Sequence, residues 1–456
     1  MLSGETFSNS TSKLMEDLSL LMEQNNQIDP ELYTRYNVKR GLRNADGTGV
    51  LVGMTEVGDV HSYIIDEGEK IPVEGRLKYR GIDIYELVRG FEEDKRFGFE
   101  ECCYLLLFGE LPDRSRLEEF SRLLSDYRQL PDNFTEDMIL KAPSANIMNK
   151  LARAVLASYS YDSNPDDTSI KNVLRQCIEL IARFPTMAAY GYQAKIHYHD
   201  KRSLYIHSPK YGLSTAENIL HMIRAASDYT QTEAETLDLA LVLHAEHGGG
   251  NNSTFATRVV SSTGTDTYSA IAAAIGSLKG PLHGGANAKV LEMMEDIKSH
   301  VRNWEDEAEV GRYVEKILRK EAFDNSGLIY GMGHAVYTVS DPRAILLKQK
   351  AVQLAKEKGM EREFNLYALI ERIAPDIFYR VKKSDKVICA NVDFYSGFVY
   401  NMLNIPEELH TPIFAIARIA GWCAHRVEEL ISGGRIIRPA YKNVVGQREY
   451  INLDER

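Results

Sequence analysis

The stretch FEECCYLLLFGELPDRSRLEEFSRLLSDY, residues 99–127, decides which class of fold the sequence predicts. Its first half is an apolar helical pattern that ends where Gly109 and Pro112 discourage a further turn. Its second half, residues 115–127, repeats apolar side chains at spacings of three and four, as an amphipathic helix does. The two halves therefore predict consecutive helices separated by a short break.

The same helical spacing recurs along most of the chain after Gly81. It is found in the segments 146–159, 170–195, 215–227, 232–247, 267–279, 305–320, 343–357 and 409–431. Strands that alternate with helices do not recur, so a Rossmann or barrel plan is not expected. The sequence predicts a mostly α, multi-helical protein.

The pattern before Gly81 is different. The first ~35 residues have a polar amphipathic pattern that ends near Asp29-Pro30, where proline discourages continuation of a helix. Between Val50 and Arg80, the short apolar runs VLVG, YIID and RLKYRG are separated by glycine and charged residues. Such runs predict a few short strands or turns near the N-terminus.

The composition is that of a globular protein with an acidic surplus. The chain has 456 residues, of which 44% are hydrophobic and 26% charged, and its formal net charge is −11. These values exclude collagen, a disulfide scaffold and extensive disorder. The acidic balance also argues against a general nucleic-acid binder. It does not exclude an anionic small molecule, because binding of a small ligand depends on local charge.

The cysteines and the first residues indicate a cytoplasmic protein. The cysteines are Cys102, Cys103, Cys177, Cys389 and Cys423. None forms a C-x-x-C pair, so free thiols in a reducing compartment are expected. The N-terminal sequence lacks a basic region followed by an apolar one, and its acidic residues argue against a transit peptide. The least polar stretch, around residues 268–278, is about half the ~20 residues needed to span a bilayer, so no membrane contact is expected.

Four glycine-rich or turn-like breaks between helices contain histidine or aspartate. They are HAEHGGGNNST (244–254), GPLHGGAN (280–287), YGMGHAVY (330–337) and NVDFYSG (391–397). Loops and helix ends are where binding and catalytic residues are usually placed. These four segments are therefore the candidate site.

The pair His244 and His247 invites a zinc interpretation that the spacing does not support. The metalloprotease pattern H-E-x-x-H places its histidines four residues apart, whereas here they are three apart, and no nearby run offers a further ligand. We therefore expect no metal. His244 is interpreted as a packed helix residue, whereas His247, which precedes three glycines, is kept as a candidate.

Other nucleotide and hydrolase motifs are weak or absent. GMGHAV at 331–336 resembles the start of a dinucleotide fingerprint, but Val336 occupies the third glycine position and no βαβ unit surrounds it. The chain has no P-loop and no G-x-S-x-G nucleophile motif.

His283, His334 and Asp393 suit proton abstraction next to a carbonyl group when they are taken together. A carboxylate can take the proton while imidazoles donate hydrogen bonds to oxygens on which charge develops. Taken singly, each residue has a structural alternative. Either histidine could be a loop hydrogen-bonder, and Asp393 could cap the following helix.

Three arginines indicate a substrate with several carboxylates. Arg343 follows Asp341-Pro342 just inside a helix start, Arg418 lies on the 409–431 helix, and Arg438 precedes a proline. The segment 411–448 has a surplus of four positive charges. Guanidinium groups bind carboxylates in a bidentate manner. The alternative for any one arginine is a solvated basic surface.

The chain closely resembles the citrate synthase family. The resemblance rests on EGRLKYRGIDIYEL (74–87), FEECCYLLLFGELP (99–112), the four breaks in the family's order, DPRA (341–344) and RIIRPAY (435–441). It implies a nearly all-helical homodimer that could assemble further. It also implies a large, dimer-forming domain on the oxaloacetate side, residues 1–287 and 395–456, and a small domain on the CoA side, 288–394, that closes over the cleft.

The resemblance also implies roles for individual residues. His283 is similar to the histidine that hydrogen-bonds the thioester oxygen of acetyl-CoA, and Asp393 to the base that removes its methyl proton. His334 is similar to the histidine that polarises the ketone of oxaloacetate. The residues similar to the carboxylate binders are His247, Arg343, Arg418 and Arg438, the last of them reaching across from the partner subunit.

The segment from Leu328 to Ala335, including Gly331 and Gly333, resembles the part of the family that binds the CoA adenine. Ala335 stands where many bacterial members have arginine. The implied activity is a Claisen-type condensation of acetyl-CoA with oxaloacetate, followed by thioester hydrolysis to citrate and CoA. No metal or redox cofactor is expected.

Two alternatives remain open at the level of the sequence. A 2-methylcitrate synthase would use propionyl-CoA through the same residues, and one extra methylene changes binding by only ~1–3 kcal/mol. An inactive paralogue could instead bind CoA or a dicarboxylate for regulation. The presence of His283, His334 and Asp393 argues against the inactive paralogue.

Overall fold

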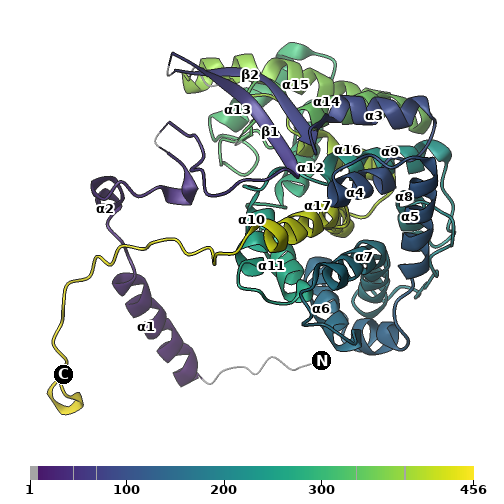
Figure 1. The fold of residues 1–456 in the computed structure, drawn as a ribbon. Coiled ribbons are helices and arrows are strands. Elements are labelled where there is room, and N and C mark those ends of the chain that lie inside the picture. The colour runs from purple at the N-terminus through teal and green to yellow at the C-terminus, as the bar shows by residue number, and fades with distance from the viewer. Residues whose placement is uncertain (1–8, 45, 68, 335, 385–386) are drawn as a thin grey trace. The chain divides into compact units, whose positions relative to one another are not determined.

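A computed structural model describes residues 9–44, 46–67, 69–334, 336–384 and 387–456 (Figure 1). Contacts between Cα atoms group the chain into one unit up to Met54 and another from Thr55 onward, and each is described by itself. The first unit contains α1 (Asn9–Asn25), α2 (Pro30–Arg35) and the short turn η1 (Arg40–Leu42).

The helix expected to end near Asp29-Pro30 is in fact two helices. α1 ends at Asn25, and Pro30 begins α2. The Asp29 side chain accepts a hydrogen bond from the Glu31 N–H at 2.9 Å and so caps α2. Proline at the first helical position loses no hydrogen bond, because the first N–H groups of a helix have no partner within it. The pair Asp29-Pro30 can therefore begin α2 as well as separate it from α1.

The second unit begins with a small antiparallel sheet. β1 (Gly58–Asp66) pairs with β2 (Glu69–Tyr79), and β2 pairs with the two-residue β3 (Ile82–Asp83). The expected short strands are therefore confirmed, although VLVG at 50–53 is not a strand. Gly75 of β2 lies against the loop before α14: a Cβ there would be 2.2 Å from the Ser340 carbonyl oxygen.

The rest of the unit is helical. The helices are α3 (Ile84–Glu93), α4 (Phe99–Phe108), α5 (Arg114–Tyr127), α6 (Ile147–Ser158), α7 (Ile170–Tyr198), α8 (Thr215–Ile223), α9 (Gln231–His244), α10 (Asn252–Ser261), α11 (Thr267–Lys279), α12 (Ala286–His300), α13 (Glu307–Leu318), α14 (Pro342–Lys358), α15 (Glu361–Lys382), α16 (Val392–Met402) and α17 (His410–Ser432). Shorter turns are η2 (Thr135–Leu140), η3 (Tyr159–Tyr161), η4 (Glu407–Leu409) and η5 (Leu453–Glu455). The mostly α prediction is confirmed.

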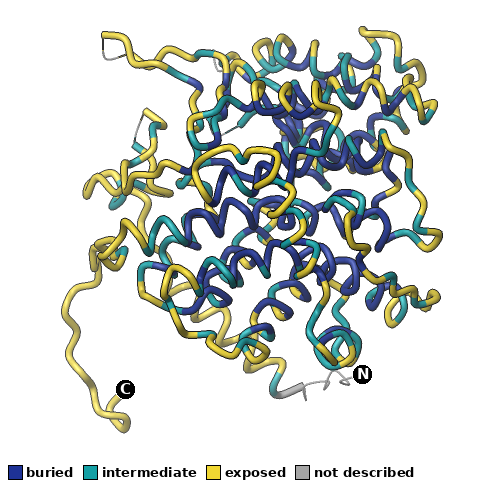
Figure 2. The backbone as a smooth tube through the Cα atoms, turned by 45° about the vertical axis from the view of Figure 1, so that its right-hand side comes forward, coloured by how far each residue is buried: buried dark blue, intermediate teal, exposed yellow. Residues whose placement is uncertain are grey.

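The core forms around α17. This helix packs against α4, α7, α9, α10 and α11, and Figure 1 shows it among them. Most of its first 17 residues are buried, including Trp422, and Figure 2 shows how the buried stretches of the helices gather inside this unit. After Ser432 the chain continues as an exposed, largely irregular tail to Arg456.

The helical segments expected from periodicity are present, with ends that differ by up to four residues. α4 ends as expected, because Gly109 adopts the left-handed conformation (φ 81°) that glycine tolerates best. Five helices outside those segments, α3, α10, α12, α15 and α16, were not expected from periodicity. In the described parts of the chain, no helix combines the length and apolarity needed to cross a membrane.

Candidate active site

The loop that carries His334 and the loop that leads into α16, where Asp393 lies, are held together by backbone hydrogen bonds. The Gly333 N–H donates to the Cys389 carbonyl oxygen at 2.6 Å, and the Asn391 N–H donates to the Gly331 carbonyl oxygen at 2.8 Å. Gly331 has φ 78°, and a Cβ there would be 2.8 Å from a ring carbon of Phe394. Only glycine fits this turn, which explains the first glycine of GMGH.

His247 joins this pair of loops from the end of α9. Its ring centroid lies 5.3 Å from that of His334 and 5.5 Å from that of Tyr337. Burial, followed by the positive charge of Arg343, holds the pKa of His247 well below its usual value. Its Nε2 atom is buried without a hydrogen-bond partner among the described residues. A neutral imidazole nitrogen of this kind is available to a ligand.

Arg418 of α17 brings a buried positive charge to the same place. Its Nε–H donates to the His244 carbonyl oxygen at 2.7 Å, while Nη1 and Nη2 are buried without partners in the described chain. Burial lowers its pKa to about 10, so the guanidinium remains charged at neutral pH. A buried guanidinium with two unpaired nitrogens is a binding site for a carboxylate.

Arg343 lies just inside the start of α14, as expected, but it already has a carboxylate partner. Its Nε and Nη2 atoms donate to Asp341 at 3.1 and 2.8 Å. Asp341 also caps α14 by accepting from the Arg343 N–H, and it accepts from the Val392 N–H at 3.3 Å. This aspartate therefore connects the start of α14 to the start of α16.

The tautomer of His334 follows from its backbone contacts. Its Nδ1 atom accepts from the N–H groups of Val336 and Tyr337 at 3.0 and 3.2 Å. An acceptor nitrogen carries no proton, so in the neutral ring the proton is on Nε2. In the neutral ring, Nε2 of His334 is therefore a hydrogen-bond donor.

His283 lies in the turn between α11 and α12, next to the start of α10. Its Nε2 atom is 3.2 Å from the Ser253 hydroxyl, which also accepts from the Trp422 indole N–H at 3.1 Å. Burial lowers the pKa of His283 to about 4, so the ring is neutral at physiological pH. A neutral histidine donates a hydrogen bond without being a strong acid, as an enolate-stabilising group requires.

Asp393 is the second residue of α16 rather than its cap. The cap is Asn391, whose side chain accepts from the Asp393 N–H at 2.9 Å. The Asp393 carboxyl shares a small cavity with Gly284, the neighbour of His283. Burial raises the pKa of Asp393 to about 6, although Arg343 and Arg418 act in the opposite direction. This basicity is matched to proton abstraction near neutral pH.

His244 and His247 have different surroundings. His244 Nδ1 donates to the Ala240 carbonyl oxygen at 2.8 Å, which agrees with its interpretation as a packed helix residue. Glu246 lies between them and accepts from His425 Nε2 at 3.0 Å. Among the residues that the structure describes, no group of three or more His, Cys, Asp or Glu side chains could hold a metal ion.

Two sets of predicted residues are not brought into the site within this chain. Arg438 lies exposed on the C-terminal tail. In the predicted adenine-binding segment, Leu328 is 56% exposed and Gly333 has φ 89°, while Gly331 supports Phe394 as described above. Ala335 lies outside the described residues.

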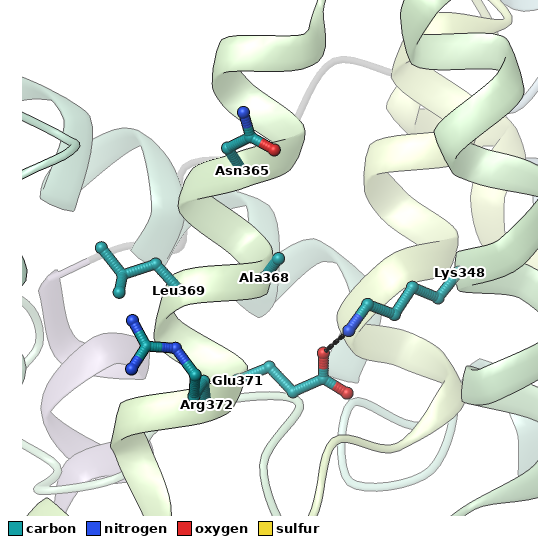
Figure 3. Close-up of a pocket in the computed structure, with 6 residues that line it drawn as sticks. All are labelled: Lys348, Asn365, Ala368, Leu369, Glu371 and Arg372. Carbon is teal, nitrogen blue, oxygen red and sulfur yellow. Dashed lines mark hydrogen bonds and ion pairs between the residues drawn. The ribbon is translucent and has the colours of Figure 1, made fainter.

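An open hollow of about 570 Å³ lies between α14 and α15, and none of the residues that line it belongs to a histidine loop (Figure 3). Its lining is Lys348, Asn365, Ala368, Leu369, Glu371 and Arg372. Lys348 is paired with Glu371, and Arg372 is paired with Glu307 at 2.8 Å. Because its charges are already paired, this hollow is not the candidate active site.

Sequence reasoning missed three residues that support the site: Ser253, Asp341 and Tyr337. Tyr337 stacks on His334 with centroids 5.1 Å apart, and the Arg343 guanidinium lies 5.5 Å from its ring centroid. Asp341-Pro342 does carry the signal of a helix start, but the pairing of Asp341 with Arg343 is not visible in that signal. The contact of Ser253 with His283 joins residues 30 positions apart.

This site unites a basic carboxylate, neutral histidines and a buried guanidinium on a helical fold. Such a set is suited to carbon acid chemistry on an anionic substrate, with no described group placed to hold a metal. The model of the family "Citrate synthase, C-terminal domain" matches residues 46–440. The chain therefore belongs to the citrate synthase family, an acyltransferase class of enzyme, and its function is that of a citrate synthase.

Relatives support the same conclusion. The chain is 37% identical over 390 residues to the citrate synthase of Synechocystis sp., covering 84% of this chain and 89% of that protein. The solved citrate synthase of Pyrobaculum aerophilum is 30% identical, with a TM-score of 0.72 over 89% of this chain and 94% of that one. The citrate synthase of Thermoplasma acidophilum was solved in a ternary complex with carboxymethyl coenzyme A and oxaloacetate. It is 25% identical, with a TM-score of 0.73 over 92% of this chain and 99% of that one. These relatives do not favour the 2-methylcitrate alternative.

Proposed function

We propose that this chain condenses acetyl-CoA with oxaloacetate through Asp393, His283 and His334, and then hydrolyses the thioester to give citrate and CoA. The observation that carries the proposal is the half-buried carboxyl of Asp393, whose pKa is raised, within electrostatic reach of Arg418, two of whose nitrogens have no partner among the described residues. The complex of the Thermoplasma relative with a CoA derivative and oxaloacetate supports the choice of substrates.

Oxaloacetate is held first in this scheme. Arg418 offers to one carboxylate two nitrogens that have no partner in the described chain, and His247, whose Nε2 also has none there, lies within electrostatic reach of Arg343, His334 and Arg418. Arg343 binds the other carboxylate once Asp341 shares or yields its hydrogen bonds. The proton on His334 Nε2 then points to the ketone oxygen and polarises the carbonyl carbon.

Acetyl-CoA is activated next. Asp393 removes a methyl proton while His283 hydrogen-bonds the thioester oxygen, on which the negative charge of the enolate develops. The Ser253 hydroxyl donates to Asn251 Oδ1 at 2.9 Å, so it can only accept from His283 Nε2, and the proton of the neutral ring is on Nε2 here. Donation to the thioester oxygen requires this N–H to turn from Ser253 to that oxygen when acetyl-CoA binds. Closure of the site would exclude water and strengthen both interactions.

Carbon–carbon bond formation and hydrolysis complete the reaction. The enolate carbon attacks the ketone carbon, and the ketone oxygen takes the proton from His334 and becomes the hydroxyl of citryl-CoA. The proton that Asp393 removed from the methyl group passes by way of water to His334, so both residues return to their starting protonation states. Water then adds to the thioester carbonyl, the carbon–sulfur bond breaks, and CoA leaves as the thiol. No metal or redox cofactor takes part in this scheme.

The assembly follows from the same proposal. Two copies form a homodimer in which Arg438, exposed on the C-terminal tail, completes the oxaloacetate site of the partner. Residues 288–394 act as the small domain that closes over the cleft, and the segment from Leu328 to Ala335 binds the adenine of CoA. The bacterial and archaeal relatives support a cytoplasmic location.

The test is turnover by the purified protein with oxaloacetate and either acetyl-CoA or propionyl-CoA, followed by release of the free thiol. The proposal expects a higher kcat/KM with acetyl-CoA, and the same rate in the presence of a strong chelator. A preference for propionyl-CoA would make the protein a 2-methylcitrate synthase. Binding of both substrates without turnover would identify an inactive paralogue.

A further inference from the structure

A small, partly open cavity next to Asp393 is lined by residues of α16 and of the start of α17, together with His244, Gly284 and Asn287. Its volume is about 10 Å³, roughly what one water molecule needs. The residues that matter in its lining are His244, Asp393, Ser396, Tyr400 and His410. A water is held in a buried cavity when two to four polar groups can bond to it, and this lining supplies them.

Tyr400 is the unexplained member of this lining. It follows Asp393 by seven residues on α16, so the two side chains lie on the same face, two turns apart. The ring is 2% exposed, yet its hydroxyl is buried without a hydrogen-bond partner among the described residues. A buried hydroxyl without a partner costs roughly 1–3 kcal/mol, so a bond to something in the cavity is expected.

The other groups define which way hydrogen bonds run in the cavity. His244 Nδ1 faces a carbonyl oxygen, which only accepts, so the proton is on Nδ1 and Nε2 is an acceptor in the neutral ring. Burial keeps His244 neutral by lowering its pKa to about 3. Ser396 Oγ accepts from Asn287 Nδ2 and keeps its own hydrogen to donate. The cavity thus has two hydroxyl donors and two acceptors, His244 and Asp393.

We propose that Tyr400 is a positioning residue for Asp393: its hydroxyl donates to one water in this cavity, and that water donates to the Asp393 carboxylate. The second hydrogen of the water goes to His244 Nε2. The inference rests on the assignment of Asp393 as the base in the proposed function. The water fixes the orientation of the carboxylate and stabilises its charged form.

The expected consequence is a shift in the pH at which the base loses activity. The other charged or titratable groups around Asp393 are Arg343, Arg418 and Asp341, with His244 and His410 in the cavity lining. Burial lowers the pKa of His410 to about 4, so neither histidine titrates near pH 6. Removal of the Tyr400 hydroxyl takes away one stabilising bond and leaves these groups in place, so the pKa of Asp393 rises.

The test compares Tyr400→Phe with Tyr367→Phe. Tyr367 of α15 is a matched control, because it is equally buried and its hydroxyl also lacks a partner among the described residues. The measurement is kcat/KM for acetyl-CoA against pH at saturating oxaloacetate. In Tyr400→Phe the acid limb moves up by about half a pH unit or more, whereas in Tyr367→Phe it stays in place.

An acid limb that coincides in the wild type, Tyr400→Phe and Tyr367→Phe would overturn the inference. If Tyr400→Phe does not fold, Ser396→Ala removes the other donor to the cavity and must shift the limb in the same direction; an unshifted limb there overturns the inference too. A different result would contradict the proposed function itself, namely an Asp393→Asn variant that keeps the wild-type rate. An inactive Asp393→Asn with an unshifted Tyr400→Phe removes only the role of Tyr400.

Discussion

Asp393 combines a raised pKa with electrostatic interactions with two arginines. Its burial disfavours the charged form more than Arg343 and Arg418 favour it, and the resulting pKa is about 6. A base must be ionised to accept a proton, so activity is present above this pH and is lost as pH falls through it. We expect kcat/KM for acetyl-CoA to fall tenfold per pH unit well below pH 6. A profile flat down to pH 4.5 would contradict this value of the pKa.

Arg418 is the residue on which oxaloacetate binding depends most within the chain. Replacement by leucine removes a buried guanidinium, two of whose nitrogens have no partner among the residues that the structure describes. A carboxylate that loses its buried charged partner loses about 2–5 kcal/mol of binding, which is a rise in Kd of about thirtyfold or more. Calorimetric titration of Arg418→Leu with oxaloacetate measures this. Arg372→Leu, at the exposed pair with Glu307, is the control and should bind normally.

His247, His283, His334 and Asp393 could be named as candidates from the sequence because each stands in a recognisable break between helices. What joins them was not. Glu246 pairs with His425, 179 residues away, and Ser253 meets His283 across 30. Pairings of this kind depend on how helices pack, and the local pattern of apolar residues contains no information about them.

Some of the helices were predictable from the sequence and others were not. α11 agrees with its expected range of 267–279, because Asp266 caps it and an apolar stripe runs along one face. α16 was not expected, because nine of its eleven residues are buried and several are aromatic or β-branched. A helix buried on all sides lacks the polar face that periodicity detects.

Gly421 of α17 is an element-scale constraint on the site. A Cβ at this position would lie 2.3 Å from Glu246 Oε2 and 2.5 Å from the Ala245 carbonyl oxygen. Gly421→Ala must therefore displace the end of α9, next to His247, and we expect it to lower the free energy of unfolding by about 1–3 kcal/mol. Urea unfolding measures the change.

Gly90 provides the matched control for this substitution. It lies in α3 with no atom within 4 Å of an added Cβ. Gly90→Ala should raise the free energy of unfolding by about 0.5–1 kcal/mol, because alanine loses less backbone freedom in a helix. Equal effects of the two substitutions would show that the crowding at Glu246 is relieved without cost.

At the scale of the whole molecule, an acidic protein binds two anionic substrates. The net charge of −11 favours a globular protein and disfavours binding to nucleic acid. The local field is different, because Arg343 and Arg418 are buried together near Asp393. The sequence indicated this contrast through the positive surplus of residues 411–448, but only the fold shows that Arg418 and Arg426 are the buried arginines of that segment.

The homodimer can be tested by combining two inactive subunits. If Arg438 completes the site of the partner, a mixed dimer of Arg438→Leu and Asp393→Asn subunits contains one intact site. Co-expression of the two variants should then restore activity to roughly a quarter of the wild-type level per subunit, from random pairing. If Arg438 acted within its own chain, every site would carry a defect and activity would stay at the level of the separate variants.

The most direct test of the central assignment is the condensation rate of Asp393→Asn, measured together with its affinity for oxaloacetate. The amide has the shape of the carboxyl but cannot take the methyl proton. We predict that kcat falls by about a hundredfold to ten-thousandfold, the usual contribution of a general base, while oxaloacetate binds within a few-fold of the wild-type Kd. A near-normal rate in Asp393→Asn would contradict the account.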